Sequence, residues 1–195
     1  MMFAALTANA VPTPGNLSPQ ELVRDTSSRM LSALRDEREE IANNPGRLYE
    51  LVAEIVLPYF DFQRMSQWVL GKNWRTATPE QRVRFVEQFR RLLVRTYGTA
   101  LSDYADEKII YLPRSDSGDS VKVTVRTEIE QGGSTIPINY SMYNSKEGWK
   151  VYDVAISGVS LVTNYRSTFA SIIRGEGMDS LIDQLVKRNG ALSGE

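Results

Sequence analysis

The chain contains no histidine and no cysteine. Histidine is the commonest general acid or base, and the two residue types together supply most zinc ligands, so their absence disfavours zinc enzymes and thiol-dependent hydrolases. The sequence also has no GxSxG, P-loop or GxGxxG pattern. Without cysteine there is no disulfide, which suits an exported protein stabilised by its core alone and equally suits a cytosolic one. What is missing therefore excludes most hydrolase mechanisms.

Long apolar runs and a strong net charge are missing as well. No run of eighteen or more apolar residues exists, so no segment is expected to span a bilayer. The net charge is −1 and the pI is about 5.7, which argues against a nucleic-acid partner that depends on a global positive field. The 195 residues are 42% hydrophobic and 24% charged, with no shift in composition along the chain. These values predict one domain with a substantial core.

The first ten residues differ from the rest of the chain. They are apolar and uncharged, and Ala8-Asn9-Ala10 has the small-x-small form of a signal-peptidase site, although a basic segment before them is missing. We interpret residues 1–10 as the remnant of a secretory signal peptide and residues 11–195 as a single domain. A plain apolar tail is the alternative.

Strand signals dominate residues 108–156. Apolar and polar residues alternate in 121–130 and again in 135–143, and Gly132-Gly133 between them suits a tight hairpin turn. A second turn leads to a further strand at 149–156, and 108–112 reads as a strand that precedes the other three. The pattern predicts four antiparallel strands.

Helices are predicted on both sides of these strands. Ser18 to Glu21 and Thr78 to Gln81 are capping boxes, and Asp61 is a candidate N-cap. Four helices, four strands and two further helices in this order favour an α+β fold with the helices segregated onto one face of the sheet. The predicted helices cover residues 18–43, 48–57, 61–70, 78–103, 159–173 and 178–189.

The helix over 78–103 carries an apolar stripe that is wider than one packing surface requires, so it can face two surfaces at once. Together with the other apolar faces, this leaves either a cavity or a fully packed core. Tyr97, Tyr104, Tyr140 and Tyr165 would suit the walls of a cavity. Asp153, in the middle of a strand, is the one carboxylate placed for a small isomerase, and its alternative role is a structural hydrogen bond.

Six blocks of the sequence carry a further signal. They are LPYFDFQRMS (57–66), VLGKNWR (69–75), ATPEQR (77–82), FRRLLVRTY (89–97), GWKVYDV (148–154) and GVSLVTNYR (158–166). Together these blocks closely resemble the MlaC family, also called the toluene-tolerance auxiliary family. The resemblance extends from about Ser18 to Asn189, with the blocks in the expected order.

The resemblance implies a periplasmic carrier rather than an enzyme. Members of this family shuttle phospholipid between an outer-membrane lipoprotein–porin complex and an inner-membrane ABC transporter complex, and so maintain outer-membrane lipid asymmetry. The resemblance also implies the family's fold, here a twisted four-stranded antiparallel sheet wrapped by about six helices. The acyl chains are then expected between the sheet and the helices, with the headgroup near solvent. We therefore expect a monomer that carries phospholipid, needs no other cofactor and binds no nucleic acid.

Two acyl chains of about sixteen carbons represent on the order of 20–25 kcal/mol of hydrocarbon to be kept from water, at roughly 0.8 kcal/mol per CH₂, so a deep pocket is expected. Arg90, Arg91, Arg95 and Arg166 are candidates for rim contacts with lipid phosphate or an acidic partner. A ligand-free interaction module and a small isomerase remain as alternatives. The residues expected to line the lipid pocket are Met65, Val69, Phe89, Leu93, Tyr97, Tyr104, Ile138, Tyr140, Val151, Val154, Val162 and Tyr165.

Overall fold

The computed structural model describes residues 17–113 and 120–191, so the expected signal remnant at 1–10 lies outside the described residues. The fold is α+β, as the sequence predicts, with helices on either side of the strands in chain order. The elements are α1 (Pro19–Asp36), α2 (Arg38–Asn43), α3 (Gly46–Ile55), the 3-10 helix η2 (Leu57–Tyr59), α4 (Phe62–Leu70), α5 (Lys72–Thr76), α6 (Pro79–Asp103), β1 (Lys108–Tyr111), β2 (Lys122–Gln131), β3 (Ser134–Ser145), β4 (Gly148–Ile156), β5 (Val159–Ser160), α7 (Leu161–Glu176) and α8 (Met178–Ala191).

The strands form one antiparallel sheet in the order β1-β2-β3-β4-β5. Val125 pairs with Tyr140, and Tyr140 pairs with Val154, so the apolar residues of three strands share one face. The predicted hairpin turn at Gly132 and Gly133 is confirmed, because both residues have the positive φ angles that such a turn requires.

The sheet has one more strand than the four that the sequence predicts. A two-residue turn at Ser157 and Gly158, both with positive φ, returns the chain so that Val159–Ser160 pairs with the end of β4. The sequence analysis assigned Val159 to the following helix. That helix begins two residues later, because the side chain of Ser160 accepts a hydrogen bond from the backbone N–H of Thr163 and caps it.

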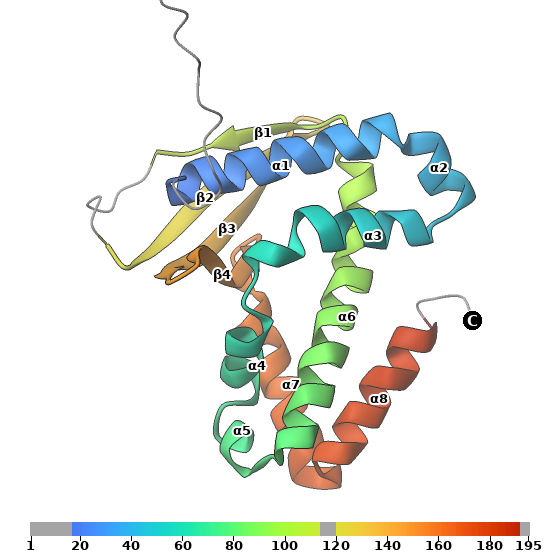
Figure 1. The fold of residues 1–195 in the computed structure, drawn as a ribbon, viewed down its shortest axis with the longest axis vertical. Helices are drawn as coiled ribbons and strands as arrows, with labels where there is room; N and C mark the ends of the chain where they lie inside the picture. The colour runs from blue at the N-terminus through green and yellow to red at the C-terminus, as the bar shows by residue number, and fades with distance from the viewer. Residues whose placement is uncertain (1–16, 114–119, 192–195) are drawn as a thin grey trace, which may run out of the picture.

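The helices form two groups that α6 connects (Figure 1). In the upper group, α1 crosses one face of the sheet and α3 lies beside α1. In the lower group, α4, α7 and α8 pack together around the first half of α6. Because α6 runs through both groups, its two halves pack against different partners, as its wide apolar stripe predicts.

The hydrophobic core has two parts that match these groups. The larger part joins α4, α6, α7 and α8 to the inner face of the sheet, with Phe85, Phe89 and Met65 fully enclosed. The smaller part joins α1, α3 and the second half of α6 through residues such as Leu34 and Leu51. The second half of α1 and α3 therefore share a core of their own, whereas Leu22 and Val23 place the start of α1 in the larger part.

The predicted helix starts are confirmed. Ser18 and Glu21 exchange both hydrogen bonds of a capping box at the start of α1, and Thr78 and Gln81 do so at the start of α6. Asp61 accepts a hydrogen bond of 2.8 Å from the backbone N–H of Arg64 and caps α4. These local signals need no tertiary information, which explains why the sequence alone finds them.

The number of helices is higher than the predicted six, since the described residues hold eight α-helices and one 3-10 helix. The helix expected over 18–43 breaks at Glu37, which separates α1 from α2. The short helix α5 follows Gly71, whose φ of +56° and close approach to Arg166 both favour glycine. Gly175, expected to interrupt a helix, lies within α7, which ends at Gly177.

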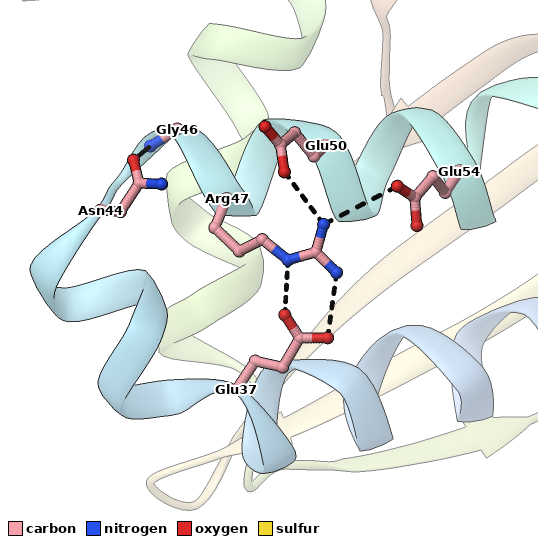
Figure 2. A network of polar contacts seen from close by, with 6 residues as sticks. All are labelled: Glu37, Asn44, Gly46, Arg47, Glu50 and Glu54. Atoms are coloured by element: carbon pink, nitrogen blue, oxygen red, sulfur yellow. Dashed lines mark hydrogen bonds and ion pairs between the residues drawn. The ribbon is translucent and has the colours of Figure 1, made fainter.

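A network of charged side chains holds the break between α1 and α2 against α3 (Figure 2). The guanidinium of Arg47 contacts both carboxylate oxygens of Glu37, at 2.6 and 3.1 Å, in a bidentate arrangement. The same guanidinium lies 2.9 Å from Glu50 and 3.7 Å from Glu54. Arg47 therefore connects the start of α3 to the end of α1, at the end of the upper group that lies away from the bundle.

We expect Glu37→Gln to lower the melting temperature by a few degrees near neutral pH. The hydrogen bond with Arg47 holds the pKa of the Glu37 carboxyl below its ordinary value. The stabilisation is therefore present above the unfolded-state pKa of about 4.3 and is lost as the pH falls through the lower folded-state value. Thermal unfolding followed by circular dichroism should show the difference from wild type shrinking below about pH 4. A difference that stays constant in acid, or an equal effect of the exposed control Glu39→Gln, would contradict this role.

Candidate functional site: an apolar cavity between sheet and helices

An apolar cavity of about 240 Å³ lies between the inner face of the sheet and the helices α1, α3 and α6. The sheet contributes its inner face to one wall, including Ile138, Tyr140 and Val154. The opposite wall consists of one face of α1, and the second half of α6 closes the side. The lining from these two helices is Leu22, Val23, Thr26, Ser27, Met30, Leu31, Leu34, Leu93, Val94, Tyr97, Gly98, Leu101 and Tyr104.

The cavity lies where the two parts of the core meet without merging. Leu22, Val23 and Leu93 belong to the larger part, whereas Met30 and Leu34 belong to the smaller part, and all five line the cavity. Side chains of the two parts thus face each other across a space instead of interdigitating. Protein interiors are normally close-packed, so an apolar space at such a junction is a candidate binding site.

Seven of the twelve residues predicted for the lipid pocket line this cavity. They come from the second half of α6, from the residue that follows this helix, and from the inner faces of β3 and β4, and the phase predicted for β3 is confirmed. The seven are Leu93, Tyr97, Tyr104, Ile138, Tyr140, Val151 and Val154.

The other five predicted residues lie elsewhere, in the packed core of the lower bundle. Phe89 contacts Tyr165 and Phe169 edge to face, with ring centroids 5.6 and 5.9 Å away, and is completely enclosed. A helix stripe shows that a residue points inward but not which of two interiors it enters, and this explains the difference. The five residues are Met65, Val69, Phe89, Val162 and Tyr165.

The sequence analysis did not assign α1 to the pocket, although α1 forms a whole wall of it. In the sequence, Leu22, Met30, Leu31 and Leu34 form an apolar stripe at helical spacing, but a stripe alone does not identify the surface that it meets. The segment between η2 and α4 was missed as well. Phe60 and Phe62 stack there with ring centroids 5.7 Å apart and line the cavity at its lower end.

Tyrosine hydroxyls are the main polar groups in the sheet wall and the α6 wall. Desolvation raises the pKa of Tyr140 to about 12, and a hydrogen bond with Thr127 opposes this shift only in part. Desolvation also raises the pKa of Tyr97, with the neighbouring Tyr165 hydroxyl adding to the effect. Both side chains are therefore neutral at physiological pH, and the wall presents no charge to a ligand.

Asp153 has a structural role and lies outside the cavity lining. Its carboxylate accepts a hydrogen bond of 2.6 Å from the Ser160 hydroxyl and one of 3.2 Å from the backbone N–H of Val162, at the start of α7. This matches the alternative that the sequence analysis left open, a structural hydrogen bond, and provides no free carboxylate at the cavity for an isomerase reaction.

The four arginines proposed for the rim do not line the apolar cavity. Arg90 and Arg91 both bind Glu87 on the same helix. Arg95 donates a hydrogen bond of 2.6 Å to the carbonyl of Asn189, and Arg166 lies against Gly71. Among these four, only Arg90 lies near the cavity, in an adjoining polar pocket.

Residues 17–113 and 120–191 contain no cluster of three or more potential metal ligands. No helix in this part of the chain has both the length and the apolar character needed to cross a membrane.

An α+β fold with an apolar cavity between its sheet and its helices defines a class of small ligand-binding proteins, and comparison with known proteins narrows that class. The sequence model of the family described as MlaC protein matches residues 24–187. The chain belongs to the MlaC family.

Individual relatives agree with this assignment. The toluene tolerance protein ttg2D of Pseudomonas putida is 29% identical over 93% of this chain and 86% of its own length. The intermembrane phospholipid transport system binding protein MlaC of Haemophilus influenzae is 27% identical over 86% of this chain and 80% of its own length. A phospholipid-binding protein from Ralstonia solanacearum, solved in complex with a phospholipid, has a TM-score of 0.85 and 31% identity, covering 91% of this chain and 99% of that structure.

We expect Tyr140→Phe to remove one late step from the alkaline titration of the tyrosines. With a folded-state pKa of about 12, against about 10 when unfolded, Tyr140 contributes stability that is complete below about pH 10 and is lost as the pH rises toward the folded value. Ultraviolet absorbance of tyrosinate measures the step, and urea unfolding measures the stability. Identical titrations of wild type and Tyr140→Phe above about pH 11 would contradict the assigned environment.

The two halves of α6 should respond differently to truncation. Phe89→Ala removes an enclosed ring from the lower core and should cost about 3–5 kcal/mol of unfolding free energy. Leu101→Ala, in the second half of α6, should cost less, because this side chain already borders an open space and its truncation only enlarges that space. Urea unfolding curves of the two variants measure the loss of unfolding free energy in each. An equal loss in the two variants would show that the cavity wall is as tightly packed as the bundle.

Proposed function

We propose that this protein is a periplasmic phospholipid carrier, which moves phospholipid between an outer-membrane lipoprotein–porin complex and an inner-membrane ABC transporter complex and thereby maintains outer-membrane lipid asymmetry. Phospholipid is the carried ligand. The observation that carries the proposal is the apolar cavity between sheet and helices, in a chain whose structural neighbour was solved with a phospholipid.

The chemistry of the lining supports this ligand class. The walls are aliphatic side chains and neutral tyrosine rings, which suit hydrocarbon, and the cavity presents no metal cluster or free carboxylate among the described residues. Burying hydrocarbon there contributes roughly 0.8 kcal/mol per CH₂. A carrier needs its ligand to stay bound during transit. At delivery, a partner has to lower the affinity for that ligand.

The size of the cavity sets a condition on loading. Its volume of about 240 Å³ is below the usual range of about 300–1,000 Å³ for small-molecule sites, and two acyl chains need more than that. The deep pocket for two acyl chains that the sequence analysis expects would lie toward or beyond the top of this range, so that expectation is wrong for the structure described. Two-chain loading therefore requires the walls of the cavity to move apart. The second half of α1 and α3 are suited to this because their buried side chains belong to the smaller core, whereas Leu22 and Val23 hold the start of α1 in the larger core.

The first test is native mass spectrometry of the purified protein, followed by organic extraction and lipid analysis. We expect a monomer with phospholipid bound in stoichiometric amount, retained through purification because the chains are shielded from water. A bare mass that stays unchanged after incubation with liposomes would overturn the carrier proposal and favour a ligand-free interaction module.

Filling the cavity should remove the lipid without unfolding the protein. Ile138→Trp places a bulky ring on the inner face of β3, where the residue lines the cavity, and should reduce co-purifying phospholipid several-fold. The matched control is Asn139→Trp, since adjacent residues of a strand point to opposite faces. Circular dichroism checks the fold of both variants. Full lipid content in Ile138→Trp, or equal losses in the two variants, would place the lipid elsewhere.

A further inference from the structure

A second, polar pocket adjoins the apolar cavity. It has a volume of about 560 Å³ and is bordered by the segment that leads into α4, by one face of α6 and by the β3–β4 hairpin. Leu57, Phe60 and Phe62 line both spaces, so the stacked rings of Phe60 and Phe62 form a shared wall. The two spaces therefore lie on either side of these rings, an apolar space beside a polar one.

The polar pocket is lined by three cations and three carboxylates. Arg90, Lys146 and Lys150 supply the positive charges, and Asp61, Glu87 and Glu147 supply the negative charges. Its formal net charge is therefore zero, but both signs are present within one small space. This arrangement differs from a simple phosphate site, in which cations predominate.

Several of these groups are already held in place by the protein. Asp61 accepts hydrogen bonds from the Arg64 backbone and from the Tyr143 hydroxyl, at 2.8 and 2.6 Å. Lys150 donates a hydrogen bond of 2.8 Å to the carbonyl of Pro58 and lies 3.5 Å from Glu147.

Lys146 and Glu147 are the two charged groups at the exposed tip of the hairpin. Within the described part of the chain, Lys146 makes no hydrogen bond or ion pair that would occupy its ammonium group. Glu147 is 82% exposed and makes one loose ion pair. These two side chains remain available to a ligand.

We propose that this pocket binds the headgroup of the phospholipid whose acyl chains lie in the apolar cavity, and that it favours a zwitterionic headgroup with a primary ammonium group over an anionic one. The inference rests on the proposed carrier function and adds a headgroup preference to it. Lys146 meets the phosphodiester, while Glu147 accepts hydrogen bonds from the ammonium group, which has three donors. An anionic headgroup brings no ammonium group to Glu147, so this second contact is missing.

The test uses the full chain loaded from vesicles that contain equal amounts of phosphatidylethanolamine and phosphatidylglycerol. Bound lipid is extracted, and both the total lipid per protein and the ratio of the two headgroups are measured. Wild type should be enriched in phosphatidylethanolamine relative to the vesicles. Glu147→Lys, which gives the pocket a net positive charge, should shift the ratio toward phosphatidylglycerol about threefold at unchanged total lipid, as expected for one partly exposed charge interaction.

Two further variants separate the pocket from general charge effects. Lys146→Glu should shift the ratio in the opposite direction. Glu39→Lys makes the same change of charge as Glu147→Lys at an exposed position on α2, outside the pocket lining, and should leave the ratio unchanged. Equal ratios in Glu147→Lys and Glu39→Lys, with full lipid content, would overturn the headgroup pocket and leave the carrier function standing. Absence of lipid from wild type would overturn the carrier function, and this inference with it.

The phosphodiester could also come from a soluble molecule instead of a lipid. Glycerophosphoethanolamine carries the same polar group without acyl chains, and it should not remain bound during gel filtration, because no hydrocarbon anchors it in the cavity. Stoichiometric retention of glycerophosphoethanolamine, seen by native mass spectrometry, would overturn the link between the pocket and lipid.

Discussion

The structure depends on one long helix that has to bury its apolar surface against two different partners. The first half of α6 packs Phe85 and Phe89 into the lower bundle, where no space remains around them. The second half turns Leu93, Tyr97 and Leu101 toward the sheet and α1, where a space does remain. Because a helix is stiff, the well-packed half fixes the position of the other half without needing close packing there.

This division allows a folded protein to keep an apolar cavity. The bundle and the inner face of the sheet supply most of the buried hydrophobic surface, while α1 and α3 form a smaller core of their own above the cavity. The bidentate contact between Arg47 and Glu37 fixes these helices to each other at their far end. Contacts between α1 and α3 thus hold these two helices together, and their packing against the sheet can remain incomplete.

The polar groups fall into two sets, one that supports the scaffold and one that faces a pocket. Asp153 and Asp61 cap helices, and Arg95 binds the end of α8, so they support the scaffold around the cavity. The charged side chains of the hairpin tip face a separate pocket that shares the Phe60–Phe62 wall with the cavity. An apolar space beside a polar one matches the two parts of a phospholipid, and neither part calls for a reactive group.

The sequence by itself determined the elements whose signals are local. Capping boxes placed the starts of α1 and α6, alternation placed β2 and β3 with the correct inner face, and similarity of long blocks indicated the family. The break at Glu37, the two-residue strand β5 and the division of α6 depended on contacts between distant residues. Phe89 and Leu93 lie on the same apolar stripe, one turn apart, yet one is sealed in the bundle and the other lines the cavity. Periodicity reports only that a residue points inward, and tertiary packing alone decides whether the interior that it meets is filled or open.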